Sequence, residues 1–330
     1  MTIEEIEMAC DASQALDFSR HALEGPELTL RQTFYPYGFP AEVRTNSAQV
    51  LKLCDELWGS FEKQHDTRPI LSEVSVFDDG RQECPPAPGC QIILPLMVAV
   101  ADSNNYSIVN HRQNSLHTVI SLATLKHELY AKYFFLSMPV SCVAATPIHA
   151  ACVTLDGRGV LLCGDSGAGK STLSYACART GWTYTSDDAS FLLNSGTKRL
   201  VIGNCREIRF RPSAAELFPE IRGLEVTPRA AGKPSIELPT VTMPHMTLAQ
   251  SAKVDFIVFL NRRAGPPQLM PYRKDVARYF MRQVLYGLPE LRAVQYEAIE
   301  HLLSAEIFQL QYSDLNPATD RLRMMVREGR

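Results

Sequence analysis

Apolar and polar positions along the chain recur with the spacing of strands and of amphipathic helices. In the first 140 residues this pattern predicts an α+β domain, preceded by a short helical arm at about residues 1–25. One helix is expected to begin near Asn46 or Ser47. Its apolar side includes Trp58 and Phe61, which we expect in the core rather than on a ligand-binding surface. The other predicted elements are strands at residues 28–37, 71–77, 92–101 and 106–110 and a helix at about 122–135.

Residues 141–330 are predicted to form a second domain, and its first element is a β-hairpin. Asp156-Gly157 separates two apolar runs and is a strong signal for a two-residue hairpin turn. A helix is expected after the hairpin, with Gly181 placed to end it. The predicted strands are residues 148–154, 159–163, 200–205, 207–210, 254–260 and 307–311, and the predicted helices are 170–179, about 275–286, 290–303 and a last one from 317.

Composition narrows the possible classes of function. A chain of 330 residues with 45% hydrophobic and 21% charged residues has the make-up of an ordinary globular protein. Its net charge of −3 gives no basic surface for nucleic acid. The longest apolar run is too short to cross a membrane, and the acidic N-terminal segment lacks a signal-peptide core. Nine scattered cysteines form no C-x-x-C pair, and Cys84 and Cys90 lack a second pair that would complete a metal site. We therefore expect a cytoplasmic protein.

The most informative stretch follows the second strand of the hairpin and matches G-x-x-x-x-G-K-[ST], the phosphate-binding loop. Its glycines permit positive φ, so that successive N–H groups can converge on a phosphate at the start of a helix. Lys170 can reach the outer phosphates, and the Ser171 hydroxyl can bind Mg²⁺. A simple glycine-rich turn between a strand and a helix is the alternative. The residues expected to bind nucleotide are Gly164, Asp165, Ser166, Gly167, Ala168, Gly169, Lys170, Ser171 and Thr172.

Two adjacent carboxylates, Asp187 and Asp188, follow a short strand predicted at about residues 182–184. An acidic residue at a strand end that faces a phosphate loop can hold Mg²⁺ or accept the proton of an attacking hydroxyl. An Asx turn or a helix cap would also explain one aspartate at this position. A further candidate is Arg262 or Arg263, which could steady a transferred phosphoryl group.

Residues 148–188 resemble the catalytic core of the HPr kinase/phosphorylase family, the phosphoenolpyruvate-carboxykinase-like kinases. The resemblance is carried by His149 at the start of the hairpin, by the G-D-S-G-A-G-K-S loop and by the Asp187-Asp188 pair. It implies an α/β fold in which the P-loop domain has a mixed sheet. The family's E-I-R-G-L-G motif is matched only in its first half, by Glu207-Ile208-Arg209, and the first 140 residues do not look like the family's usual N-terminal domain.

The resemblance also implies roles for these residues. Asp187 would be the general base, and His149 would pair with it and tune its proton affinity. The expected catalytic residues are Asp187, Asp188, His149 and Lys170, and the expected Mg²⁺ ligands are Ser171, Asp188 and Glu207.

These observations predict an ATP- and Mg²⁺-dependent kinase that phosphorylates a hydroxyl group on a peptide, a protein or a small molecule. Two alternatives remain: a nucleotide-dependent binding or switch module with little transfer activity, and a bifunctional kinase/phosphorylase. We expect acceptor specificity in the N-terminal domain, in the loop at residues 230–234 and in the final helices. The resemblance suggests a homo-oligomer.

Overall fold

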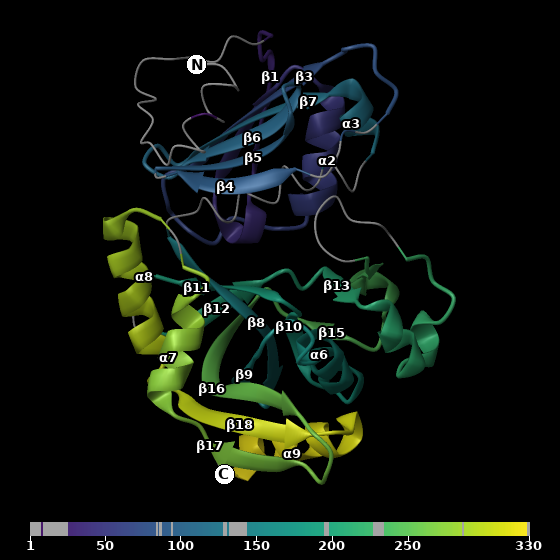
Figure 1. Cartoon of the computed structure of the whole chain (residues 1–330), viewed down its shortest axis with the longest axis vertical. Coiled ribbons are helices and arrows are strands. Elements are labelled where there is room, and N and C mark those ends of the chain that lie inside the picture. The colour runs from purple at the N-terminus through teal and green to yellow at the C-terminus, as the bar shows by residue number, and fades with distance from the viewer. Residues whose placement is uncertain are drawn as a thin grey trace. The chain divides into compact units, whose positions relative to one another are not determined.

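The computed structural model describes Met8 and residues 26–83, 85, 88–93, 95–127, 131, 144–194, 198–226, 234–285 and 287–328 (Figure 1). The chain divides into two compact units, the first ending at Val143 and the second beginning at Ala144. The predicted helical arm at residues 1–25, Cys84 and nearly all of the loop at 230–234 lie outside the described residues.

The first unit contains a seven-stranded mixed sheet with the strand order β1-β2-β3-β7-β6-β5-β4 (Figure 1). Strands β2, β3 and β7 run parallel to one another, and the remaining neighbours are antiparallel. Trp58 and Phe61 are buried, which confirms their predicted place in the core. The strands are β1 (Leu30–Phe34), β2 (Ala41–Thr45), β3 (Ile70–Phe77), β4 (Gly89–Ile93), β5 (Leu96–Asp102), β6 (Asn105–Asn110) and β7 (Ser115–Ser121), and the helices are η1 (Pro36–Gly38), α2 (Ala48–Trp58) and α3 (Leu122–Lys126).

One sequence prediction for this unit was wrong, and two of its strands, β2 and β7, were not predicted. The apolar run at 92–101, predicted as one strand, is divided between β4 and β5, which pair as an antiparallel hairpin on either side of Pro95. Strand β7 was not predicted, because Ser, His and Thr interrupt its apolar pattern. Helix α3 begins where the second helix was expected, and its end at Lys126 is fixed by a cap residue, His127, with non-helical backbone angles.

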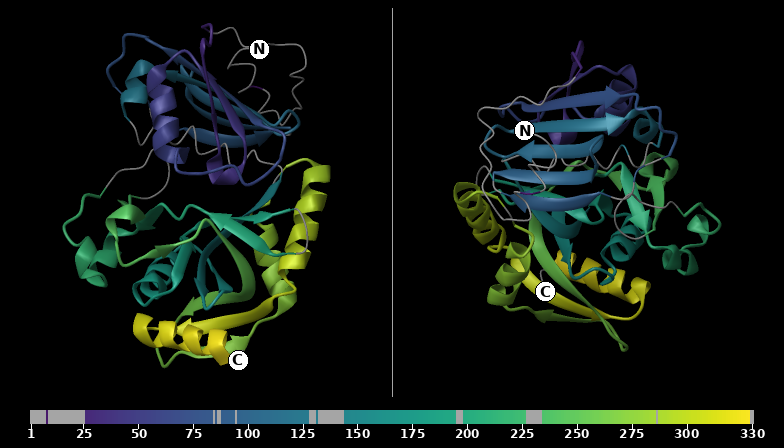
Figure 2. Two further views of the ribbon diagram at one scale, coloured as in Figure 1. Left: turned by 180° about the vertical axis from the view of Figure 1, so that it is seen from behind. Right: turned by 45° about the horizontal axis from the view of Figure 1, so that its top comes forward.

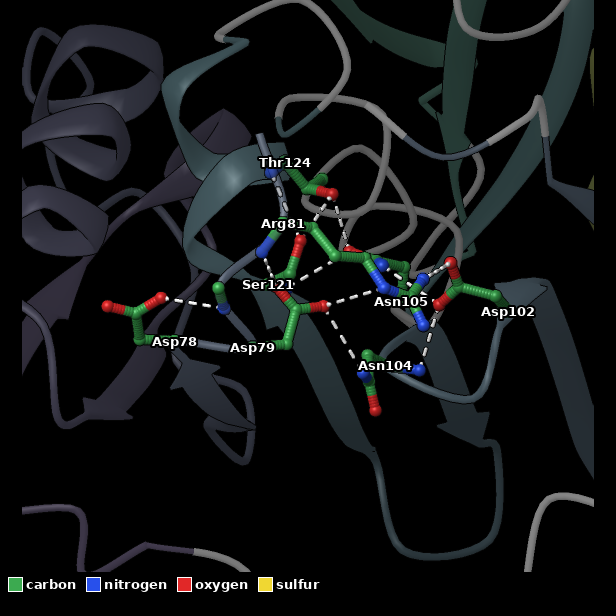
Figure 3. A network of polar contacts seen from close by, with 9 residues as sticks. Asp78, Asp79, Arg81, Asp102, Asn104, Asn105, Ser121 and Thr124 are labelled. Carbon is green, nitrogen blue, oxygen red and sulfur yellow. Dashed lines mark hydrogen bonds and ion pairs between the residues drawn. The ribbon is translucent and has the colours of Figure 1, made fainter. Parts of the chain in front are cut away.

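A network of polar side chains joins the loop after β3 to the β5–β6 turn and to the start of α3 (Figure 3). Asn105 is buried, and its amide oxygen accepts hydrogen bonds from the Ser121 N–H at 3.0 Å and the Thr124 hydroxyl at 2.5 Å. Its amide nitrogen donates to Asp102 at 2.9 Å, and Arg81 lies 3.1 Å from the same carboxylate. The buried Asn105 thus has both ends of its amide bonded within the fold, which indicates a structural role for this network.

The second unit contains a nine-stranded mixed sheet in which the long strand β8 is central. One edge of β8 pairs with β9, and its other edge pairs with β10 and β11 in turn. Strand β9 also lies parallel to β16, and β16 lies parallel to β18. The strands are β8 (Ala145–Leu155), β9 (Arg158–Cys163), β10 (Thr183–Ser186), β11 (Ala189–Leu193), β12 (Leu200–Gly203), β15 (Thr247–Leu248), β16 (Ser251–Arg262), β17 (Gln268–Pro271) and β18 (Glu306–Tyr312).

Four helices cover the faces of this sheet. Residues of α6 and α9 pack on one face and residues of α7 and α8 on the other, and Figures 1 and 2 show the second pair side by side. The central strands are apolar on both sides, since alternate residues of β9 belong to the two cores. The helices are α6 (Lys170–Arg179), α7 (Lys274–Arg282), α8 (Pro289–Leu302) and α9 (Leu315–Glu328). A separate two-stranded ribbon consists of β13 (Glu207–Phe210) and β14 (Ile236–Pro239). The short helices of this unit are η2 (Pro212–Glu216), η3 (Pro219–Ile221) and η4 (Thr240–Thr242).

The α/β fold class expected from the sequence is confirmed, and both large sheets are mixed. The Asp156-Gly157 turn is also confirmed, with φ of 51° and 77° at its two residues. Helix α6 has the predicted bounds, whereas α9 begins at Leu315, ahead of the predicted start at residue 317. Among the described helices, none combines the length and apolar character that crossing a membrane requires.

Candidate active site

The phosphate-loop motif forms the connection between β9 and α6. Gly164, Gly167 and Gly169 all have positive φ, of 151°, 92° and 98°. A Cβ on Gly164 would lie 2.8 Å from the Ala168 Cβ, so the first turn of the loop has no room for a side chain there. The loop closes through a hydrogen bond from the Ala168 N–H to the Asp165 carbonyl at 3.0 Å. Asp165, Ser166 and Gly167 are exposed, and Ser171 and Thr172 are half-buried in the first turn of α6.

Lys170, the first residue of α6, is 5% exposed, and its ammonium group turns back onto the loop. It donates to the carbonyl oxygens of Gly164 at 2.8 Å and Asp165 at 3.3 Å. It also lies 2.9 Å from the His149 Nε2 and 3.6 Å from the Asp188 Oδ1. The structure therefore joins three parts of the predicted site, namely the loop lysine, the hairpin histidine and the acidic doublet.

His149 lies in β8, and its second ring nitrogen, Nδ1, is 3.4 Å from the Asp188 Oδ1. Burial lowers the pKa of His149, and the nearby Asp188 carboxylate offsets part of that effect. Because the Lys170 ammonium can only donate to Nε2, the neutral ring carries its proton on Nδ1, facing Asp188. The family resemblance had implied a pairing of His149 with Asp187, and the described contact is instead with Asp188.

The acidic doublet lies at a break between β10 and β11, which both pair with β8. Ser186 pairs with Cys152 and Ala189 with His149, and the two aspartates between them form a bend without ladder pairing. Their carboxylates take different partners: the Asp187 Oδ2 accepts the Arg209 N–H at 2.8 Å, while Asp188 faces Lys170. A strand and not a helix follows the doublet, which excludes the alternative of a helix cap.

Asp187 is half-buried beside the first turn of α6. Burial raises the pKa of Asp187 to about 7, the Arg209 N–H opposes that shift, and the charges of Asp188 and Glu207 add to it. A carboxylate with a pKa near 7 can accept a proton effectively at neutral pH. The Ser171 hydroxyl donates to the Asp187 carbonyl oxygen at 3.5 Å, which brings this predicted Mg²⁺ ligand next to the doublet.

Glu207 lies on the β13–β14 ribbon, where it is ion-paired with Arg209 at 2.5 Å. Arg209 is also 3.7 Å from Glu237, its neighbour across the ribbon. Burial by itself disfavours the charged guanidinium, but the carboxylates of Glu207, Glu237 and Asp187 outweigh it and raise the pKa of Arg209. Glu207 is therefore linked to the doublet through Arg209, but it would have to release Arg209 to Glu237 before it could bind a metal ion.

Arg262 is exposed at the end of β16, opposite Tyr312 of β18. Sequence reasoning missed both Tyr312 and Glu237. Tyr312 donates a hydrogen bond from its hydroxyl to the Ala168 carbonyl of the phosphate loop at 3.0 Å. No local motif surrounds either residue, and only strand pairing brings them to the site.

The oxygen atoms of Ser171 and of the doublet are the kind of ligand that Mg²⁺ prefers. Across the described part of the chain, no three His, Cys, Asp or Glu side chains converge as a metal site of their own. This donor set fits an ion that is also held by phosphate oxygens, as Mg²⁺ is in phosphoryl-transfer sites.

In comparisons with protein-family models and with curated proteins, nothing matches this sequence. Among solved structures, the chain is similar to the HPr(Ser) kinase/phosphatase from Coxiella burnetii, with 17% sequence identity. The match covers 56% of this chain and 95% of that one, with a TM-score of 0.30. A similarity of this size indicates a distant relationship at most.

Proposed function

We propose that this protein is an ATP- and Mg²⁺-dependent kinase that transfers the γ-phosphoryl group of ATP to a hydroxyl group. The observation that carries the proposal is the 3.6 Å separation between the Lys170 Nζ and the Asp188 Oδ1. It unites a phosphate-binding loop with a pair of carboxylates, and a phosphoryl-transfer site needs both. A glycine-rich turn without function would not require a buried lysine beside the Asp188 carboxylate.

The loop supplies the nucleotide-binding half of the site. Its positive-φ glycines and the N-terminus of α6 suit an anion, because unpaired N–H groups and the helix dipole both favour negative charge there. Lys170 would exchange the Gly164 and Asp165 carbonyls for phosphate oxygens and so neutralise charge that develops during transfer. Arg262 would add a second positive charge from the end of β16.

The residues that would hold Mg²⁺ are Ser171 and Asp188, with Glu207 joining them if Arg209 moves toward Glu237. When bound, the ion neutralises phosphate charge and orients the transferred group. Ser171 would bind through its hydroxyl at the start of α6, and the doublet would supply charged oxygens from the opposite strand.

The proton of the acceptor hydroxyl would pass to Asp187, whose pKa of about 7 suits a general base. The acceptor oxygen forms its bond to the γ-phosphorus, the bond from that phosphorus to the bridging oxygen breaks, and ADP leaves. His149 would hold Asp188 through its Nδ1–H and keep Lys170 in reach through Nε2. The acceptor belongs to the broad class of hydroxyl-bearing peptides, proteins and small molecules, and the first unit would take part in its recognition.

We further propose that the chain is a divergent, cytoplasmic relative of the HPr kinases and that it assembles as a homo-oligomer. The residues matching the family motif support the relationship. Incubation of a phosphorylated acceptor with inorganic phosphate would separate a bifunctional enzyme from a one-way kinase, since only the former releases pyrophosphate.

ATP consumption and phosphorylated products, measured over a panel of acceptors, test the proposal. Lys170→Ala and Asp187→Asn should each reduce transfer by at least about 100-fold, and Asp188→Asn should weaken it and raise its Mg²⁺ requirement. Asp156→Asn is the matched control, because it makes the same carboxylate-to-amide change in the distant hairpin turn. Unchanged transfer in both Lys170→Ala and Asp187→Asn would remove the kinase assignment. Partner capture that needs ATP and survives Asp187→Asn would instead support a switch module.

A further inference from the structure

Tyr312 is the last residue of β18, far from the phosphate loop in sequence but in direct contact with it. Its side chain is 1% exposed, and its hydroxyl donates to the Ala168 carbonyl at 3.0 Å. A Cβ on the next residue, Gly169, would overlap that hydroxyl oxygen. The tyrosine therefore touches the single peptide unit that connects the loop to helix α6.

We propose that Tyr312 is a positioning residue that aims the Gly169 N–H of the phosphate loop at the bound nucleotide's phosphates. The inference rests on the proposed nucleotide binding and adds to it a residue outside the loop motif. In a trans peptide the C=O and N–H groups point in opposite directions. A carbonyl of Ala168 fixed toward the buried Tyr312 leaves the Gly169 N–H directed to the opposite, solvent-facing side of the loop, where Ser166 and Gly167 are exposed.

The tyrosine is itself held firmly. Arg262 is its partner in the parallel ladder between β16 and β18, and the Arg263 N–H donates to the Tyr312 carbonyl at 2.9 Å. The ring belongs to the core that α6 and α9 share. Burial raises the pKa of Tyr312 to about 12, so the phenol keeps the proton that it donates. A rigid donor of this kind can hold one orientation of the Ala168–Gly169 peptide before any ligand binds.

A buried tyrosine often satisfies its hydroxyl on a nearby carbonyl for reasons of stability alone. Tyr175 provides the comparison that separates the two roles. It is also buried in this core, on α6 itself, and its hydroxyl donates to Glu220 at 2.9 Å without any described contact to the loop. Tyr175→Phe and Tyr312→Phe thus remove the same atom from the same core, but only the second releases a loop carbonyl.

Calorimetric titration of the full-length variants with ADP and ATP tests the inference. Tyr312→Phe should weaken binding by about 5- to 20-fold, the size expected for one lost hydrogen bond and a less ordered loop. Tyr175→Phe should change the affinity for ADP and ATP by less than about 2-fold, although it should lower thermal stability about as much as Tyr312→Phe does. Equal affinity in wild type and Tyr312→Phe would overturn the positioning role and leave nucleotide binding intact. A wild type that binds no nucleotide would remove the proposed function first.

A spectroscopic measurement observes the peptide directly. Labelling alanine carbonyls with ¹³C and glycine nitrogens with ¹⁵N restricts the detected amides to the Ala–Gly pairs at 168–169, 231–232 and 264–265. ADP should shift the Gly169 amide strongly in the wild-type protein, and Tyr312→Phe should lose most of that shift. A Gly169 amide that does not respond to ADP in a wild type that binds it would contradict the inference.

Discussion

Each unit contains a compact cluster of polar side chains, and the two clusters differ in what satisfies them. In the first unit, buried Asn105 is bonded to the backbone and side chains of its own fold, including the Ser121 N–H and Asp102 (Figure 3). In the second, the Lys170 ammonium is held by loop carbonyls and by Asp188, whose side chain is 56% exposed. The centre of the first cluster is a buried amide whose described partners belong to the fold, whereas the centre of the second is a buried ammonium whose partner Asp188 is open to water. This difference separates a structural network from a candidate binding site.

Of the substitutions that test this difference between the two clusters, Lys170→Ala should have the largest effect. Removing the cation should reduce phosphoryl transfer by about 100- to 1,000-fold, the usual cost of losing one charge-stabilising group. The free energy of unfolding should fall by about 1–3 kcal/mol at most, because the buried Gly164 carbonyl loses its donor while Asp188 stays in contact with water. Single-turnover kinetics and denaturant unfolding measure the two quantities. A large loss of stability with normal transfer would place Lys170 among the structural residues.

Asn105→Ala should show the opposite pattern. It leaves the Ser121 N–H and the Thr124 hydroxyl without their buried acceptor, so we expect a loss of about 2–3 kcal/mol of stability. Calorimetry can follow the unit that unfolds first, because two units need not melt together. Asn104→Ala is the control: this half-buried side chain donates only to Asp79, and we expect a loss below about 1 kcal/mol. Impaired transfer in fully folded Asn105→Ala would break the comparison.

The local half of the site could be predicted from sequence, and the half that depends on distant pairing could not. Asp156-Gly157 and the loop glycines act through their own backbone angles, so a short window of sequence was sufficient. Glu237 and Tyr312 reach the site only through the β13–β14 and β16–β18 pairings. The division of the apolar run at residues 92–101 did have a local signal, Pro95, which the hydrophobic pattern alone does not take into account.

The partner of His149 illustrates how sensitive such inferences are to one residue of register. Neighbouring side chains in an extended segment point to opposite sides, so a shift of one position exchanges their environments. In this chain Asp187 turns to the Arg209 N–H and Asp188 to His149. The motif established that two carboxylates lie near the loop, while the break in the β8 ladder decides which of them the histidine contacts.

The pH dependence of stability provides a smaller test of the second cluster. The folded pKa of Asp187 is about 7, above its ordinary value of 3.8, so between about pH 4 and pH 7 the folded protein retains a proton that the unfolded chain releases. Its stability should therefore fall as the pH rises through that window. Asp187→Asn lacks this titration. Its free energy of unfolding, measured relative to the wild type, should therefore rise by about 1–2 kcal/mol from pH 5 to pH 8, a magnitude that allows for the remaining exposure of Asp187. Urea unfolding in Mg²⁺-free buffer measures the gain, and a constant difference across this range would contradict the shifted pKa.

The smallest effect concerns the contact between Tyr312 and the phosphate loop. Gly169→Ala should weaken ADP binding in the wild type, because the new Cβ meets the Tyr312 hydroxyl and because φ is 98°. In Tyr312→Phe that oxygen is gone, and the nearest ring carbon, 3.7 Å away, allows ordinary contact. The backbone strain is common to both backgrounds, so the alanine should cost about 1 kcal/mol less in the phenylalanine background. A double-mutant cycle of ADP affinities gives this coupling. If the two effects simply add, the hydroxyl does not constrain Gly169, and the loop is held by its own glycines alone.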